Sequence, residues 1–238
     1  MAFPGILGVL GGNEMRAACR PFDEALAAAA GGPNEVCVVP AAVVQNGSVS
    51  RALAGARRYF GGLGLKVTHV QLHRRSDASR LEVVAALRGS RFTYILGGDP
   101  GYLLETVRET PAWAAMRAAL GEGGALAGSS AGAMVMAETL LLRSRNPSPR
   151  ARHGKQALSI LPRVVVIPHL NNFGQGWLDS ARREAQGRDI LGLDEATGLV
   201  YSGGWRAHGP GVVKLWRRGG DPPVVRTDGD ALAWRAPR

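Results

Sequence analysis

Two serines lie between glycines at the end of a small apolar run in GALAGSSAGAMVM, residues 124–136. Gly128-Ser129-Ser130-Ala131-Gly132 fits the G-x-S-x-G pattern of a nucleophile elbow, in which a buried strand turns sharply into a helix with the central serine at the apex. Ser130 is therefore a candidate nucleophile for acyl transfer. A tight strand–helix turn without chemistry fits the same spacing, so the motif alone leaves both interpretations open.

A serine hydroxyl attacks an acyl carbon only when a neighbouring base takes its proton, and the base needs a carboxylate that holds its tautomer. His169 closes the run VVVIPH, the strand pattern that follows the serine's strand in the chain. Asp194 and Glu195 lie between an apolar run and a strand pattern in LGLDEATGLV. We expect His169 as the base and one of these two carboxylates as its partner.

The oxyanion of acyl transfer needs hydrogen-bond donors, commonly the backbone N–H after the nucleophile and one from a nearby glycine loop. Ala131 and Gly98 fit these two places, and Gly98 lies in GGDPGY directly after the run FTYIL. In open parallel sheets, ligands meet the carboxyl ends of the strands. Gly98, Ser130 and His169 each follow a predicted strand, which favours a common site.

Short apolar runs alternate with helical patterns almost from end to end. Their valine and isoleucine content and their lack of strict alternation are typical of strands that are buried on both faces. The predicted strands are Ile6–Leu10, Glu35–Pro40, Lys66–Leu72, Phe92–Leu96, Ala125–Gly128, Arg163–Pro168, Gly198–Tyr201 and Val212–Trp216. The pattern predicts one α/β domain over residues 1–238, with a mainly parallel sheet flanked by helices on both faces and an antiparallel edge after residue 198.

Helical patterns fill the intervals between these strands. The first runs from near Asn13 to the stop at residues 31–32, and the second runs from Ser48 to residues 61–62. A third covers SRLEVVAALRG, with Leu81, Val84 and Leu87 on one face. Others cover YLLETVRE, PAWAAMRAAL, the residues after Ser130, and WLDSARREAQ. Residues 143–154, RSRNPSPRARHG, are predicted to form a loop, either a flap near the site or a plain connection.

The amino-acid composition and net charge limit the classes of molecule that the protein is expected to bind. The net charge of +10 comes mostly from scattered arginines, aromatic residues are only 6%, and no RNA-binding signature or zinc spacing occurs. We therefore expect solvated faces, or a field that attracts acidic substrates, and no nucleic-acid partner. Cys19 and Cys37 form no disulfide framework, and neither a signal peptide nor a membrane span is predicted. We expect a cytoplasmic protein that needs neither metal nor organic cofactor.

The segments GGDPGYLLETV, AGSSAGAMVM, VIPHLNN and GLDEATGL together resemble the peptidase E and cyanophycinase family of serine peptidases. The resemblance covers most of the chain, from GGNEM to GLDEATG. It implies an α/β fold related to class I glutamine amidotransferases, with serine in place of cysteine at the elbow, and a homodimer. It further implies Ser130 as nucleophile, His169 as base, Glu195 as the orienting acid and Gly98 as the oxyanion glycine.

The chain departs from the cyanophycinase branch after the histidine. That branch has an H-F-x-x-R-G-R run, whereas this chain reads HLNNFGQ from His169 and lacks its arginines. Peptidase E is the better match there, with a proline before the histidine and an asparagine, Asn172, three residues after it. Its acid-binding arginine matches Arg183, or Arg182 if the register is off by one. Its acidic residue after the nucleophile helix has no counterpart in RSRNPSP.

Together these patterns predict a serine peptidase that cleaves short peptides with an acidic residue near the scissile bond, with Asp99, Asn172 and Arg183 as candidate substrate-binding residues. One alternative is an α/β-hydrolase-like esterase that uses Ser130, Asp194 and His208. It is disfavoured because His208 lies in the glycine-rich stretch GGWRAHGPG and no H-G-G-G motif precedes the elbow. The other alternative is a non-catalytic basic binding protein on a peptidase-like scaffold.

Overall fold

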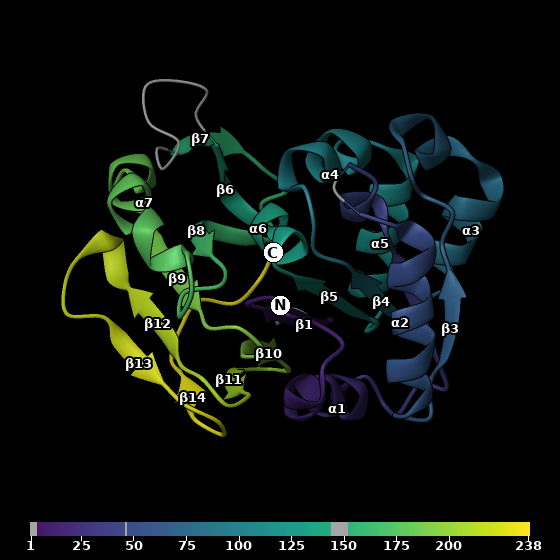
Figure 1. Cartoon of the computed structure of the whole chain (residues 1–238), viewed down its shortest axis with the longest axis horizontal. Coiled ribbons are helices and arrows are strands. Elements are labelled where there is room, and N and C mark those ends of the chain that lie inside the picture. Colours follow the sequence, from purple (N-terminus) through teal and green to yellow (C-terminus); the bar gives the residue numbers. More distant parts are fainter. Residues whose placement is uncertain (1–3, 46, 144–151) are drawn as a thin grey trace.

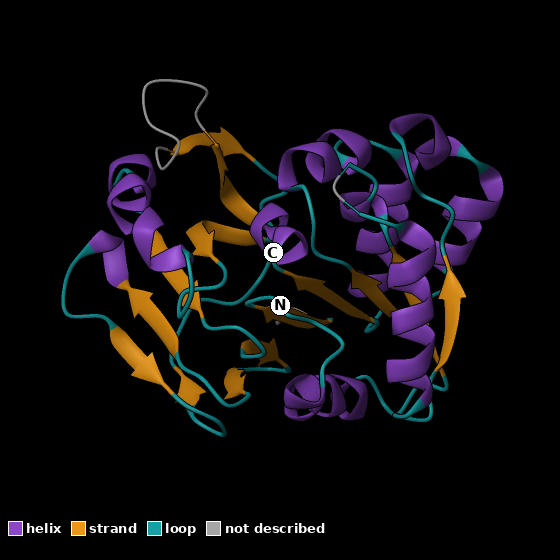
Figure 2. Cartoon of the chain, in the orientation of Figure 1, coloured by secondary structure: helices purple, strands orange, loops and turns teal. Residues whose placement is uncertain are grey.

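Two β-sheets and the helices around them make up the computed structural model, which describes residues 4–45, 47–143 and 152–238. Figure 1 shows the second sheet with α7 (Leu178–Ala185) on the left, and the parallel strands of the first sheet with helices α2–α5 on the right. The helices form layers around the strands (Figure 2).

The first sheet has the strand order β14-β11-β10-β1-β5-β4-β2-β3. Its strands are β1 (Ile6–Leu10), β2 (Glu35–Val39), β3 (Lys66–His69), β4 (Phe92–Ile95), β5 (Ala125–Ser129), β10 (Gly198–Tyr201), β11 (Trp205–His208) and β14 (Ala231–Leu232). The pairs among β1 to β5 are parallel, and β10, β11 and β14 add antiparallel strands. The mainly parallel sheet with an antiparallel edge after residue 198 is therefore confirmed.

A second sheet, which the sequence analysis does not anticipate, has the strand order β13-β12-β9-β8-β6-β7. Its strands are β6 (Ala137–Arg143), β7 (Arg152–Gln156), β8 (Leu161–Ile167), β9 (Asp189–Leu193), β12 (Val213–Trp216) and β13 (Val224–Arg226). The helix after Ser130 ends at Met136, and β6 begins at once. Of the predicted 143–154 loop, residues 144–151 lie outside the described residues, and β7 begins at residue 152.

The helices are α1 (Arg20–Ala29), α2 (Val49–Gly61), α3 (Leu81–Arg88), α4 (Pro100–Val107), α5 (Pro111–Gly121), α6 (Ala131–Met136) and α7. Short 3₁₀ turns cover Ala17–Cys19, Ala41–Val43, Arg75–Ser79, Gly174–Trp177 and Arg217–Gly219. Side-chain oxygens of Ser48, Asp99 and Thr110 cap α2, α4 and α5 by accepting backbone N–H groups of the first turn.

Two expected helix details are wrong. α1 starts at Arg20 because Asn13 and Met15 have positive φ and cannot continue a helix. In α3, Leu81 is 85% exposed while Val83 and Leu87 are buried. Leu81 is the first residue of α3, and its side chain is not covered by the core. The buried face of the helix is therefore formed by Val83 and Leu87, which are four residues apart and lie on the same side.

Buried apolar residues pack on both faces of the first sheet. Along β1, Leu7 and Val9 join one core cluster with α4, α5 and α6, while Ile6 and Leu10 join the other with α1 and α2. The alternation sends successive side chains to opposite faces. Both faces of the parallel strands are thereby covered, as expected for helices on both sides of such a sheet.

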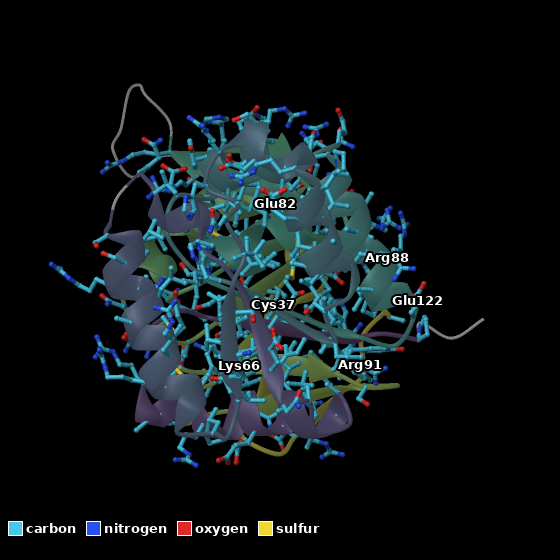
Figure 3. All side chains as sticks on the ribbon, turned by 90° about the vertical axis from the view of Figure 1, so that its right-hand side faces the viewer. Cys37, Lys66, Glu82, Arg88, Arg91 and Glu122 are labelled. Atoms are coloured by element: carbon cyan, nitrogen blue, oxygen red, sulfur yellow. The ribbon has the colours of Figure 1, made fainter. Side chains whose placement is uncertain are left out.

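Several charged side chains lie exposed on one outer face of this framework. On the side of β3 and α3, Lys66, Glu82 and Arg88 are exposed, and Arg88 pairs with Glu122 (Figure 3). Arg88 thus lies on a solvated face. None of the described helices combines the length and the hydropathy of a membrane-spanning segment.

Candidate active site

Ser130 lies at a sharp turn between β5 and α6, with φ 47° and ψ −106°. A Cβ on Gly128 would stand 2.4 Å from the carbonyl carbon of Gly132, and a Cβ on Gly132 would stand 2.6 Å from the carbonyl oxygen of Ile95. No larger residue fits either place without moving backbone. The glycines therefore let strand, turn and helix approach closely, and the serine takes a backbone conformation that is costly for a residue with a Cβ.

The register of the first sheet gathers the loops around this serine. Leu10 pairs with Ser129, and Ile95 pairs with Gly128, so β1, β4 and β5 end at the same edge. In the second sheet, Ile167 of β8 pairs with Gly192 of β9, so these two parallel strands also end at the same edge of their sheet. The site is built where the carboxyl ends of strands from both sheets meet.

The side chains of Ser130, His169 and Glu195 form a continuous hydrogen-bonded chain. His169 Nε2 lies 3.0 Å from Ser130 Oγ, and His169 Nδ1 lies 2.8 Å from Glu195 Oε1. The side chains of His169 and Glu195 are 16% and 26% exposed. With Nδ1 protonated toward Glu195, Nε2 is free to accept the hydroxyl proton of Ser130.

Glu195 is held as a carboxylate by its neighbours. The hydrogen bond from His169 lowers the pKa of Glu195 below its ordinary value, and a second hydrogen bond from the Asn172 amide, at 3.2 Å, lowers it further against the effect of burial. Asn171 Oδ1 accepts the backbone N–H of Glu195 at 3.0 Å. The two asparagines after His169 thus fasten the loop that carries the acid.

The glycine loop after β4 lies beside the nucleophile. A Cβ on Gly97 would stand 3.2 Å from Ser130 Cβ. Gly98 has φ 144°, and a Cβ there would stand 2.1 Å from the carbonyl oxygen of Ala42. Among the described residues, neither the backbone N–H of Gly98 nor that of Ala131 donates a hydrogen bond to another group of the chain. Both N–H groups therefore remain available to a ligand.

The three predicted substrate-binding residues have different surroundings. Asp99 caps α4, accepting the N–H of Tyr102 at 2.7 Å, while Asn172 contacts Glu195. Arg183 is exposed, and its Nη2 donates to Ser180 Oγ at 3.1 Å. Arg182 forms an ion pair with Asp221. Among the described residues, the Arg182 guanidinium is thus paired with a carboxylate, whereas the Arg183 guanidinium is not.

The rival esterase set does not assemble. Asp194 Oδ2 accepts the backbone N–H of Val212 at 2.9 Å and joins β9 to β12. His208 lies on β11, with Nδ1 3.9 Å from Asp228 Oδ1. Among the described contacts, neither side chain reaches Ser130. His208 is distant because β11 is an antiparallel strand beyond β10 rather than a neighbour of β5.

An aromatic stack borders the histidine and was missed from sequence. The Phe173 ring stacks on His169 at 4.7 Å between centroids, and Trp177 lies 5.4 Å from Phe173. The guanidinium of Arg152 lies 4.4 Å from the centre of the Trp177 ring. Phe173 is nevertheless 49% exposed. The signal was the pair of aromatics in FGQGW, four and eight residues beyond His169.

The first strand's loop is a second feature without a predicted role. The carbonyl of Gly11 accepts the N–H of His169 at 2.7 Å, and the carbonyl of Gly12 accepts that of Ala196 at 2.9 Å. A Cβ on Gly12, which has φ 113°, would stand 2.2 Å from the His169 ring. The signal in the sequence was GGNEM directly after a strand. Across the described residues, no group of three or more potential metal ligands gathers.

A nucleophile elbow on an α/β fold, with its serine facing a histidine, is the arrangement found in hydrolases of the serine type. The sequence model of peptidase family S51 matches residues 7–206, and the chain belongs to that family. Peptidase activity of the serine type is what membership of this family suggests for the chain.

Sequence relatives and solved structures agree with this. The chain is 28% identical over 172 residues to a cyanophycinase from Nostoc sp. (strain PCC 7120), covering 68% of this chain and 58% of that protein. It is 29% identical over 220 residues to a cyanophycinase from Synechococcus elongatus, covering 89% and 67%. The chain thus spans little more than half the length of the Nostoc protein.

A peptidase from an acI-B1 Actinobacterium has a similar crystal structure, with a TM-score of 0.83, 28% identity and 97% coverage of both chains. A protein from Listeria monocytogenes EGD-e described as a candidate peptidase E has a TM-score of 0.63 at 18% identity, covering 90% of this chain and 98% of that one. The second similarity establishes the fold alone.

Proposed function

We propose that this peptidase hydrolyses short peptides with an acidic residue near the scissile bond through a Ser-His-Glu mechanism. The observation that carries the mechanism is the unbroken hydrogen-bonded chain from Ser130 Oγ through His169 to Glu195 Oε1. Such a chain supplies the nucleophile, the base and the group that stabilises the imidazolium.

In the first half-reaction, Ser130 Oγ attacks the scissile carbonyl carbon while His169 Nε2 takes the hydroxyl proton. The oxyanion that forms accepts hydrogen bonds from the backbone N–H groups of Gly98 and Ala131. His169 then gives its proton to the leaving amine as the C–N bond breaks, which leaves an acyl-serine. A water molecule attacks that ester, its proton passes through His169 to Ser130 Oγ, and the free carboxylate leaves.

The preference for an acidic substrate is supported by charge. The chain has a net charge of +10, and the exposed guanidinium of Arg183 lies on α7, which follows the His169 loop. Arginine binds a carboxylate through a planar fork of two N–H groups, which suits an acidic side chain better than lysine does. Asp99 and Asn172 remain candidate contacts for the rest of the peptide.

The central experiment compares two adjacent serines. Ser130→Ala should abolish peptide hydrolysis and labelling by a fluorophosphonate while leaving the fold intact, because a small side chain is lost. Ser129→Ala should still be labelled and should keep part of the activity, since its hydroxyl lies at the variable position of the elbow and is not the nucleophile. Equal loss at both serines would refute Ser130 as the nucleophile, and an unlabelled, inactive parent would refute the proposed reaction.

Two broader features belong to the same proposal. The family resemblance supports a homodimer, which light scattering on the purified chain would test. Two free, buried cysteines suit a reducing compartment and hence a cytoplasmic location. A monomer in solution would remove the first of these features without touching the mechanism.

A further inference from the structure

The loop GGNEM after β1 contacts every segment that the proposed mechanism uses. Its two glycine carbonyls hold the backbone at His169 and at Ala196, next to Glu195. The backbone N–H of Ser130 also donates to the carbonyl of Leu10, directly before this loop, at 2.9 Å. One further side chain of the loop, that of Glu14, reaches the remaining segments.

The Glu14 carboxylate bridges the glycine loop and the elbow. Its Oε1 accepts the N–H of Gly97 at 2.8 Å, and its Oε2 accepts the hydroxyl of Ser129 at 2.8 Å. The side chain is half-buried, and a Cβ on Gly97 would stand 2.9 Å from Oε1. Gly97 is therefore required for the carboxylate to approach the backbone so closely.

These contacts bear on the orientation of Gly98. The N–H before it, that of Gly97, is held by Glu14, and the N–H after it, that of Asp99, is held by the carbonyl of Ala42 at 2.8 Å. The Gly98 N–H is thus fixed between two anchored neighbours. Oxyanion donors stabilise a transition state because they are oriented before the reaction begins, and a misplacement of about 1 Å can cost about 100-fold in rate.

We propose that Glu14 is a positioning residue that holds the Gly98 N–H and the Ser130 elbow in one fixed relation. The inference rests on the proposed function, because it takes Gly98 as an oxyanion donor. Both carboxylate oxygens accept internal donors, and through them Glu14 joins the two loops. Charge-assisted hydrogen bonds to a backbone N–H and a hydroxyl are strong enough for this purpose.

Substitutions at this position separate length from charge. Glu14→Gln keeps the reach, since its oxygen can accept from Gly97 and its amide can donate to Ser129 Oγ. Glu14→Asp keeps the charge but is too short to bridge both groups, and Glu14→Ala loses both contacts. We expect kcat to fall on the order of 100-fold in Glu14→Ala and clearly in Glu14→Asp, with KM close to the parent's, whereas Glu14→Gln stays near the parent.

Glu24→Ala is the matched control, because it removes an exposed glutamate of α1 that pairs with Arg20. If Glu14→Ala does not fold, Glu14→Asp and Glu14→Gln carry the comparison. The proposal is overturned if Glu14→Ala keeps the parent's kcat. It is also overturned if Glu14→Gln loses as much as Glu14→Ala and KM rises for peptides with a free α-amine, since Glu14 would then bind the substrate's ammonium group.

Amide hydrogen exchange distinguishes a failure of this inference from a failure of the proposed function. Exchange at Gly97 should be faster in Glu14→Ala than in the parent and in Glu14→Gln, whether or not the chain cleaves a peptide. A parent that hydrolyses nothing and resists fluorophosphonate would refute the proposed function, and faster exchange would still support the bridge. Unchanged exchange in Glu14→Ala would refute the bridge even in an active enzyme.

Discussion

Adjacent acidic residues have unequal surroundings at the turn between β9 and β10. Glu195 points to His169 and has a pKa below its ordinary value because of that hydrogen bond, whereas Asp194 accepts a backbone N–H from Val212. The Glu195 carboxylate therefore faces the His169 ring, whereas the Asp194 carboxylate closes the turn. Substitutions at the two positions should differ in kind.

We expect Glu195→Gln to lower kcat strongly, because an amide cannot stabilise the imidazolium, and His169→Ala to lower it by about 10⁴-fold or more. Asp194→Asn should have a mild effect on kcat, since its amide oxygen can still accept from Val212. Steady-state kinetics on one peptide, with melting temperatures as a check on folding, would measure this. Greater sensitivity at Asp194 would show that the acid is wrongly assigned.

The neighbouring arginines of α7 allow a matched test of specificity. Loss of a charge-assisted hydrogen bond of roughly 1.5–3 kcal/mol should lower kcat/KM by about 10- to 150-fold. Arg183→Met should show that loss for an Asp-containing peptide and little for its Asn-containing analogue. Arg182→Met, which breaks a pair with Asp221, is the control. An equal loss for both peptides, or no acidic preference in the parent, would remove the acid-specific part of the proposal.

At the scale of elements, close approach between segments determines which residues the site tolerates. Three strand ends of the first sheet and two of the second meet within one group of loops, and glycine occupies the crowded places. The positive φ of Gly98 and its contact with the Ala42 carbonyl leave no room for a side chain. This crowding makes the loop geometry sensitive to a single methyl group.

Gly98→Ala should therefore lower kcat by on the order of 100-fold and lower the melting temperature, because the loop must shift away from Ala42. The matched control is Gly55→Ala on α2, where a Cβ meets nothing within 4 Å. That control should keep activity and gain about 0.5–1 kcal/mol in the free energy of unfolding. Normal kcat in Gly98→Ala would exclude a tight oxyanion loop at this position.

At the scale of the whole molecule, one buried carboxyl makes stability depend on pH. Asp23 on α1 is fully buried and accepts the hydroxyl of Tyr59 at 2.7 Å. Burial raises the pKa of Asp23 from 3.8 to about 7, although the bond from Tyr59 opposes the shift. Because the folded protein holds this proton more tightly than the unfolded chain, its contribution to stability is present at low pH and is lost as pH rises.

We expect the free energy of unfolding of the parent to fall as pH rises between 3.8 and about 7 on account of this group. Asp23→Asn should remove that dependence, so that the free energy of unfolding of the variant rises relative to that of the parent between pH 5 and pH 8. Urea unfolding at several pH values would measure the difference. Glu24→Gln changes an exposed carboxyl of the same helix, and its free energy of unfolding should change with pH in the same way as the parent's. Parallel curves for Asp23→Asn would mean that Asp23 does not titrate in this range.

Local patterns were enough to predict the strand–helix alternation of the first sheet and the turn at Ser130. β1 and β10 have the predicted bounds, and most other predicted strands are within a few residues of the observed ones. This worked because a strand that is buried on both faces is an apolar run in any context, and because Gly128 is required by a contact with Gly132 within one strand–turn–helix unit. Gly132 is required by its contact with Ile95 of the neighbouring strand β4, which the spacing alone does not show. The residues of the Ser-His-Glu proposal were also named from sequence, from their positions after such runs and from the family resemblance.

Tertiary structure alone decided how distant segments pair. β6 lies in a stretch after the Ser130 helix for which no strand was predicted, and it becomes a strand by pairing with β7 and β8. Glu14 meets Gly97 across 83 positions, and Arg182 finds Asp221 across 39. Hydrophobic periodicity reports which face of an element is buried but not which partner buries it. The second sheet, the contacts of Glu14 and the separation of Arg182 from Arg183 therefore emerge only when the chain is packed.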